Sequence, residues 1–142
     1  MTDYNKVFLD TAPVIYFLEK SDLYYEKMKL ILQSFIDKDT ELFTSAITFE
    51  EYEVGPLKSG NTQLIQNFER FIDDLGINVI NIDQSIAAEA AFIRAKYTGF
   101  KAMDSLQLAA AISENCDLFL TNDKQLLQFT QMDCKTVENM NI

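Results

Sequence analysis

The sequence predicts an α/β fold in which a mostly parallel sheet of four to five strands is covered by helices on both faces. Short apolar runs alternate with longer segments of helical periodicity, which is the pattern of a parallel sheet with crossover helices. Of the 142 residues, 48% are hydrophobic and 24% are charged, the composition of an ordinary globular domain. No repeat or linker divides the chain, so we expect residues 1–142 to form a single domain.

The strands are predicted from short apolar runs that lie between turn-forming residues. The first run reads Val-Phe-Leu and lacks the polar alternation of a half-exposed strand, which indicates a buried strand of a parallel sheet. In chain order, the expected strands cover residues 7–9, 42–44, 77–80 and 117–121, with a weak last strand near 136–137.

The helices are predicted from apolar spacing and from residues suited to helix ends. Pro13 suits the first position of a helix, and Ser21 and Asp83 suit N-caps. Thr48 opens the third helix, and Gly76 suits the position just after the end of the fourth helix. The expected helices cover 13–19, 21–38, a segment from 48 onward, 61–75, 84–97 and 104–115, with a short helix after the fourth strand. The apolar sequence of the helix over 104–115 leaves little polar face, so we expect it to be buried.

Several classes of enzyme are excluded by residues that the sequence lacks. It contains no histidine, which excludes Ser-His-Asp and Cys-His catalysis, histidine-based ribonuclease chemistry and imidazole zinc sites. Its two cysteines are too few for a four-cysteine zinc site, and its four glycines form no phosphate-binding pattern. The net charge of −10 has the wrong sign for a protein that coats nucleic acid. Catalysis would therefore rest on carboxylates, hydroxyls, Lys or Arg, with a hard metal ion.

Acidic residues follow the predicted strands. Asp10 directly follows the first strand, and Asp123 follows the fourth. Glu50 and Glu51 come one helical turn after the second strand, and Asp104 opens the buried helix that leads into the fourth. Because functional sites of parallel α/β sheets lie at the carboxyl edge, we expect these side chains to share that edge.

Some of these acids have an alternative interpretation as helix caps. Asp104 and Asp123 could each accept backbone N–H groups as N-caps, and we expect no further role for Asp83. The segment from Thr48 to Glu51 fits a capping box, in which the glutamate reaches back to the N–H of the threonine.

Asp10 does not fit the capping interpretation. If Pro13 is the first helical residue, then Ala12 is the cap and Asp10 lies too early in the chain. A carboxylate buried after an apolar strand is costly to ionise without a partner, and no cation is nearer in sequence than Lys6. Clustered carboxylates would also raise one another's pKa. Bound Mg²⁺ or Mn²⁺ would remove this conflict, and such ions can assist attack on a phosphodiester.

Four segments carry a resemblance to a known family. They are residues 8–16 (FLDTAPVIY), 44–51 (TSAITFEE) with 55–58 (GPLK), 104–111 (DSLQLAAA) and 119–123 (FLTND). Together they resemble the motifs of PIN domains, in particular the VapC-like toxin ribonucleases, in the family's order and across nearly the whole chain. The resemblance implies a PIN-like three-layer sandwich with a shared metal site.

The resemblance also implies an activity. It implies a Mg²⁺- or Mn²⁺-dependent endoribonuclease specific for single-stranded RNA, which leaves 5′-phosphate and 3′-hydroxyl ends. It further implies the toxin of a type II toxin–antitoxin pair, with a small antitoxin that occludes the site, and a homodimer. The alternative is a catalytically silent PIN-like module that binds RNA or protein and keeps its acids as caps.

The family's four acids correspond to residues of this sequence. By resemblance, Asp10, Asp104 and Asp123 hold the metal ion, directly or through water, and Glu51 positions a metal or the attacking water. Glu51 is preferred to Glu50 because the family places its glutamate six residues after the serine of this motif and four before the glycine.

Polar and basic residues near these acids complete the expected site. The polar residues that resemble orienting groups for carboxylates or waters are Thr11, Thr121 and Asn122. The basic residues that could contact RNA, or could simply be solvated, are Lys101 and Lys124, with Arg94 and Lys96 further out.

The helix over 21–38 carries more apolar residues than one core-facing stripe requires, namely Tyr24, Tyr25, Met28, Ile31, Leu32 and Phe35. Core packing is the favoured explanation, and the alternative is a groove for a partner helix, which is consistent with the antitoxin that the resemblance implies.

We assign no function to Cys116 and Cys134. The apolar stretch over 7–18 is interrupted, lacks a basic leader and is too short to span a membrane. A cytoplasmic protein with reduced thiols is therefore expected.

Overall fold

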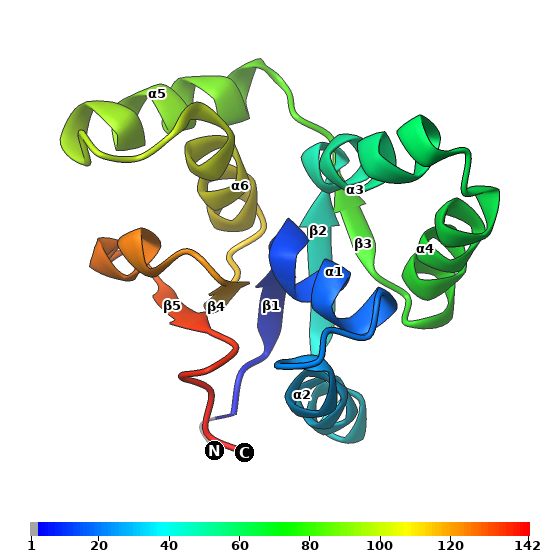
Figure 1. Cartoon of the computed structure of the whole chain (residues 1–142). Coiled ribbons are helices and arrows are strands. Elements are labelled where there is room, and N and C mark those ends of the chain that lie inside the picture. The colour runs from blue at the N-terminus through cyan, green and yellow to red at the C-terminus, as the bar shows by residue number, and fades with distance from the viewer. Residues whose placement is uncertain (1–2) are drawn as a thin grey trace.

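A computed structural model describes residues 3–142 and contains one five-stranded sheet, in which every neighbouring pair of strands is parallel (Figure 1). Its order is β3-β2-β1-β4-β5, and its strands are β1 (Lys6–Leu9), β2 (Glu41–Ser45), β3 (Asn78–Ile80), β4 (Leu118–Thr121) and β5 (Asp133–Thr136). The predicted α/β class and parallel sheet are confirmed, as is the weak last strand.

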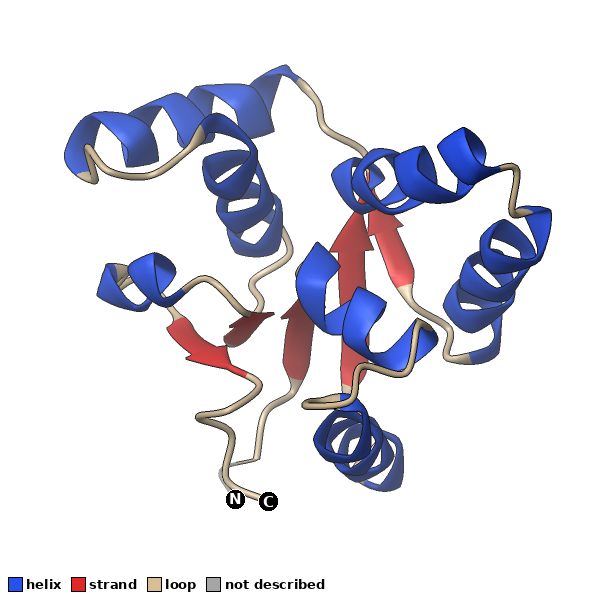
Figure 2. Ribbon diagram, in the orientation of Figure 1, coloured by secondary structure: helices blue, strands red, loops and turns tan. Residues whose placement is uncertain are grey.

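Helices cover both faces of the sheet (Figure 2). They are α1 (Thr11–Leu18), α2 (Tyr25–Asp37), α3 (Ala46–Ser59), α4 (Thr62–Asp74), α5 (Gln84–Lys96), α6 (Ala102–Ser113) and a 3₁₀ helix, η1 (Lys124–Gln128). The helices α1 to α4 pack against one face, and α5, α6 and η1 pack against the other.

The central strands are buried on both sides, which explains their continuous apolar sequence. Val7 and Leu9 of β1 belong to the core under α1 to α4, whereas Phe8 belongs to the core under α5 and α6. All three side chains are fully buried. The Phe8 ring stacks on that of Phe119, its partner on β4, with centroids 5.2 Å apart.

The order of the strands changes direction next to β1. The chain adds β2 and then β3 on one side of β1, and later places β4 and then β5 on its other side. Loops leaving β1 and β4 therefore diverge toward opposite helical layers at the carboxyl edge, which is where open α/β sheets bind ligands.

The beginnings of α1 and α2 differ from the prediction. Asp10 is the N-cap of α1 and accepts the Thr11 N–H, and Pro13 is the third helical residue rather than the first. Proline is tolerated there because the first four N–H groups of a helix have no partner within it. The helix α2 begins only at Tyr25, and Ser21 Oγ accepts the Tyr24 N–H in the turn before it.

The beginnings of α3 and α6 also differ from the prediction. Ser45 caps α3 by accepting the Ile47 N–H, so Thr48 lies inside the helix and the predicted capping box is wrong. Asp104 is the third residue of α6, whose cap position is Lys101, so the capping interpretation of this acid is also wrong.

Other predicted helix ends are confirmed. Asp83 caps α5 by accepting the Ile86 N–H, and Asp123 caps η1 by accepting the Gln125 N–H. Gly76 follows α4 with a φ of +60°, as expected for a glycine after a helix. None of the helices within residues 3–142 is long and apolar enough to cross a membrane.

Candidate active site

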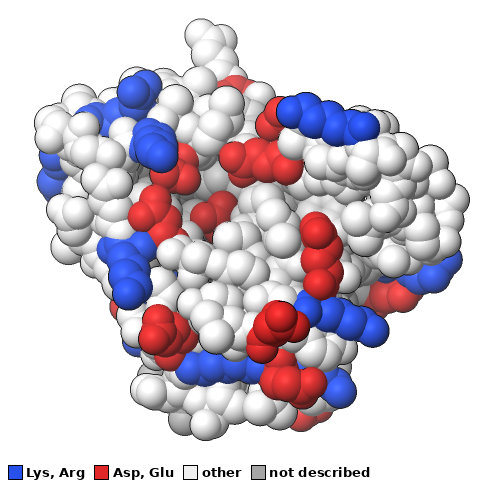
Figure 3. Space-filling model, viewed as in Figure 1, with Lys and Arg blue, Asp and Glu red and all other residues white. Residues whose placement is uncertain are grey.

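A cleft of about 420 Å³ lies at the carboxyl edge of β1 and β4. Its lining includes all four predicted acids, Asp10, Glu51, Asp104 and Asp123, and the polar residues Thr11, Thr121 and Asn122. In the space-filling view, acidic side chains surround a hollow on the face turned toward the reader, and basic side chains lie along one side of it (Figure 3).

Asp10 lies at the floor of the cleft and is held only by uncharged donors. Its Oδ1 accepts the Thr11 N–H at 2.9 Å and the Gln107 Nε2 amide at 3.3 Å, and its Oδ2 accepts the Thr121 hydroxyl at 2.9 Å. Burial raises the pKa of this carboxyl, and these hydrogen bonds oppose the rise. The side chain is 9% exposed, so its charge is largely removed from solvent.

Glu51 and its neighbour Glu50 point to different places. Thr11 Oγ1 donates to Glu51 Oε1 at 2.7 Å, and Glu51 lines the cleft. Glu50 is instead part of a separate surface depression beside Phe49 and Leu57. The helix α3 thus brings Glu51, and not Glu50, to the other acids.

Asp104 is the acid whose ionisation is most affected by its neighbours in the cleft. Burial, followed by the charges of Asp10, Asp123 and Glu51, raises the pKa of Asp104 to about 6, and Lys101 opposes this rise. Asp104 lies in the first turn of α6, where the helix dipole favours a negative charge, but its side chain forms no capping hydrogen bond.

Asp123 combines both roles considered from the sequence. It caps η1 and also lines the cleft. Thr121 connects it to Asp10, because the Thr121 hydroxyl accepts the Asp123 N–H at 3.1 Å and donates to Asp10. Asn122 lies between Thr121 and Asp123 in the chain and is exposed at the cleft.

Among the residues that the structure describes, none with a basic side chain forms an ion pair with any of the four carboxylates. Within residues 3–142, the ion pair that forms is between Lys38 Nζ and Asp3, at 2.6 Å and outside the cleft. Lys101, three residues before Asp104, and Lys124, directly after Asp123, are exposed, and Arg94 and Lys96 are exposed in the last turn of α5. The cleft therefore concentrates negative charge and places positive charge only at its margin.

The donor set of the cleft fits a hard divalent ion. Within the described part of the chain, no group of three or more acidic or cysteine side chains is arranged to enclose an ion by itself. Mg²⁺ does not require such a group, because it commonly binds one or two carboxylates and keeps several waters. Carboxylate and hydroxyl oxygens, room for water and a buried carboxyl held by uncharged donors all suit Mg²⁺ or Mn²⁺.

Sequence reasoning missed a layer of polar side chains beneath the cleft. Gln107, Ser45, Thr48 and Thr44 are buried and bonded to one another. The available signal was Gln107 itself, a polar residue within the otherwise apolar run of α6.

A family model described as PIN domain matches residues 7–132. The chain belongs to the PIN domain family. No curated protein matches this PIN domain significantly by sequence.

Solved structures share the fold of this PIN domain. FitAcB from Neisseria gonorrhoeae is similar with a TM-score of 0.75 and 23% identity, over 94% of this chain and 99% of that one. VapBC2 from Rickettsia felis, bound to a promoter DNA fragment, is similar with a TM-score of 0.72 and 18% identity, over 92% of this chain and 98% of that one. DNA-bound VapBC from Salmonella typhimurium is similar with a TM-score of 0.70 and 22% identity, over 93% of this chain and 98% of that one.

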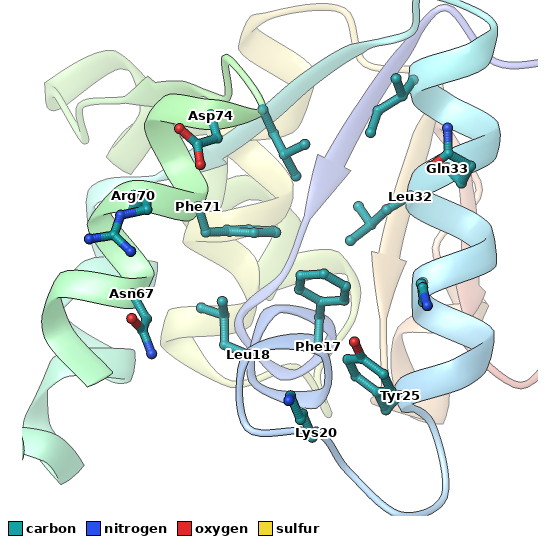
Figure 4. Close-up of a pocket in the computed structure, with 13 residues that line it drawn as sticks. Phe17, Leu18, Lys20, Tyr25, Leu32, Gln33, Asn67, Arg70, Phe71 and Asp74 are labelled. Carbon is teal, nitrogen blue, oxygen red and sulfur yellow. The ribbon is translucent and has the colours of Figure 1, made fainter. Parts of the chain in front are cut away.

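A second, more apolar cleft of about 480 Å³ lies between α2 and α4 of the PIN domain (Figure 4). Phe17 and Leu18 form its base, Tyr25 and Leu32 face it from α2, and Phe71 faces it from α4.

The apolar residues of α2 are mostly explained by the core. Met28, Ile31, Leu32 and Phe35 are buried, which confirms core packing for them. Tyr25 is half-buried and stacks on Phe17, with ring centroids 5.6 Å apart.

Proposed function

We propose that this PIN domain is a Mg²⁺- or Mn²⁺-dependent endoribonuclease that hydrolyses phosphodiester bonds of single-stranded RNA. The observation that carries the proposal is the convergence of four carboxylates, without a contacting cation, in one cleft at the carboxyl edge of the sheet. Membership of the PIN family supports the same assignment.

Each acid has a role in the proposed reaction. Asp10, Asp104 and Asp123 hold the ion, directly or through water, and Glu51, oriented by the Thr11 hydroxyl, positions a metal or the attacking water. When bound, the ion supplies positive charge to the phosphate oxygens and lowers the pKa of water. The water oxygen bonds to phosphorus as the bond to the 3′-oxygen breaks, which leaves a 5′-phosphate and a 3′-hydroxyl.

The basic residues at the margin of the cleft are proposed to contact the RNA backbone. Lys101 and Lys124 are exposed beside two of the acids, where they could meet phosphates on either side of the scissile bond. Reversal of charge at Lys101 should then raise the KM for RNA more than it lowers kcat, and an unchanged KM would leave it a solvated surface lysine.

A cleavage assay tests the proposal. Partner-free protein is incubated with end-labelled single-stranded RNA in Mg²⁺ or Mn²⁺, with EDTA and Asp104→Asn as controls, and with double-stranded RNA and single-stranded DNA for comparison. We expect cleavage of the single-stranded RNA that both controls abolish. Ends with 2′,3′-cyclic phosphate would contradict the route. A folded protein with neither cleavage nor stabilisation by metal would support the silent binding module.

We also propose that the protein is the toxin of a toxin–antitoxin pair, acts in the cytoplasm and forms a homodimer. Two further structural neighbours support a toxin role, since the name of one, from Klebsiella pneumoniae, describes a toxin–antitoxin complex and that of the other, VapBC-5 from Mycobacterium tuberculosis, a member of a family of toxin–antitoxin systems. The apolar cleft between α2 and α4 is suited to an antitoxin helix.

The partner proposal is tested by co-expression with the product of an adjacent gene. Ile36 is 50% exposed and lines the cleft, so Ile36→Glu should prevent co-purification of the partner. Leu57→Glu is the matched control, because Leu57 is 66% exposed on α3, outside the cleft. Light scattering of the free protein tests the homodimer.

A further inference from the structure

Gln107 lies at the centre of the polar layer beneath the acidic cleft. It is 1% exposed and sits on α6 between apolar neighbours. Its Nε2 donates to Asp10 Oδ1 at 3.3 Å and to Thr48 Oγ1 at 2.9 Å, and its Oε1 accepts from Ser45 Oγ. Both N–H donors of the side-chain amide and one acceptor position of its oxygen are therefore in use.

The contact with Asp10 distinguishes the two oxygens of that carboxylate. Oδ1 accepts two N–H groups, from Thr11 and Gln107, whereas Oδ2 accepts one hydroxyl, from Thr121. Each oxygen of an ionised carboxylate has two lone pairs. The protein thus occupies Oδ1 and leaves Oδ2 with an acceptor position for a ligand in the cleft.

The contact with Thr48 connects Gln107 to a second acid. Thr48 Oγ1 lies 3.2 Å from Thr11 Oγ1, and the Thr11 hydroxyl donates to Glu51 Oε1 at 2.7 Å. One amide from α6 therefore contacts Asp10 directly and reaches Glu51 through two hydroxyl groups. These two acids follow β1 and β2, whereas Gln107 comes from the opposite helical layer.

We propose that Gln107 is a positioning residue of the active site, which orients Asp10 for binding through Oδ2 and aligns Glu51 through Thr48 and Thr11. The inference rests on the proposed metal-dependent function. An apolar side chain of the same length would fill the space but would remove one of the two donors to Oδ1, so that only Thr11 and Thr121 would still orient the carboxylate. Loss of such supporting hydrogen bonds typically weakens metal binding by about 10- to 100-fold.

Gln107→Met tests the proposal, because methionine keeps the length of the side chain and removes the amide. We expect Mn²⁺ binding, measured by electron paramagnetic resonance without RNA, to weaken about 10-fold while the far-ultraviolet circular dichroism is unchanged. The kcat on RNA should fall more than KM changes. Ser105→Ala is the matched control, since Ser105 is buried on the same helix but donates to the Lys101 carbonyl at 3.0 Å.

A second pair of variants decides the question if Gln107→Met does not fold. Thr48→Val removes the hydroxyl with little change in shape and should weaken Mn²⁺ binding, and Thr48→Ser should restore it. A folded Gln107→Met protein that binds Mn²⁺ as tightly as the wild type overturns the proposal, as does a Thr48→Ser protein as weak as Thr48→Val. Wild-type protein that binds no Mn²⁺ would instead contradict the proposed function.

Discussion

Because the pKa of Asp104 is raised in the folded state, the stability of the metal-free protein depends on pH. The pKa is raised to about 6 in the folded state, against about 3.9 in an unfolded chain. Between these pH values the folded protein holds more protons than the unfolded chain, so the free energy of unfolding falls as the pH rises through this range. The folded protein is fully destabilised above the pKa that Asp104 has in the folded state, and it is not destabilised well below the pKa that Asp104 has in the unfolded chain.

Asp104→Asn should therefore stabilise the metal-free protein at pH 7.5. We expect a gain on the order of 1 kcal/mol, reduced by solvent screening at this half-exposed side chain, because the amide removes the cost of burying an ionised carboxyl and the repulsion from the other three acids. Urea denaturation in EDTA measures the gain, which should be much smaller at pH 4. An equal gain at both pH values would contradict electrostatic repulsion as its cause.

The same ionisation should make metal binding depend on pH. Protonation of Asp104 removes a ligand charge, so Mn²⁺ affinity should decline as the pH falls through about 6. Titration of Mn²⁺ at pH 7.5 and pH 5 measures the change. Equal affinities at the two pH values would mean that this carboxyl does not contribute to binding.

The two adjacent glutamates offer a matched comparison. Glu51→Gln should lower the rate of RNA cleavage by about 100-fold or more, since Glu51 faces the other acids and is oriented by Thr11. Glu50→Gln should leave the rate unchanged, because Glu50 lies in a different depression. Comparable losses in both variants would refute the assignment.

The residues of the cleft were predictable to different degrees. Strand ends identify Asp10 and Asp123, because the carboxyl ends of parallel strands meet at one edge. Gln107 was not predictable, because a single polar residue in an apolar helix says nothing about which distant segments it meets. Its contacts come from residues that are 59 to 97 positions away in the chain.

At the scale of elements, the types of helix and strand were predictable and several helix beginnings were not. Ser45 and Thr48 are both suitable caps, and they are only three residues apart. Thr48 instead contacts Thr44, Thr11 and Gln107, so tertiary contacts decide where α3 begins. Local sequence preferences do not contain these contacts.

Gly76 provides a test of one correctly predicted helix end. Its φ of +60° is unfavourable for a residue with a Cβ, so Gly76→Ala should lower the free energy of unfolding by about 1 kcal/mol. Gly76→Asn should cost less, because asparagine adopts this conformation more readily. Both variants should keep full cleavage activity, because Gly76 precedes β3 at the edge opposite the cleft. Chemical denaturation measures the difference, and equal stability of wild type and Gly76→Ala would contradict it.

At the scale of the whole molecule, the net charge of −10 opposes the binding of RNA. At physiological ionic strength, charges further than about 8 Å from a phosphate are largely screened. The charges that matter are therefore the bound ion and the basic residues at the margin of the cleft.

Metal binding should raise the melting temperature of the whole domain. At a Mn²⁺ concentration of about 100 times Kd, linkage adds about 2.7 kcal/mol to the free energy of unfolding. For a domain of this size, the gain corresponds to a shift of about 8 °C. Differential scanning fluorimetry measures the shift, with KCl of equal ionic strength and Asp104→Asn as controls. An equal shift with KCl would indicate general screening instead of a site.

The strand order described above also governs when the cleft can form during protein synthesis. Asp10 leaves the ribosome early with β1, but β4 pairs with β1 and is the last strand but one to be made. Thr121 and Asp123 emerge with it. A nascent chain therefore cannot assemble all four acids until nearly the whole domain has been translated. For the ribonuclease proposed above, this topology therefore postpones assembly of the active site until late in the synthesis of the domain.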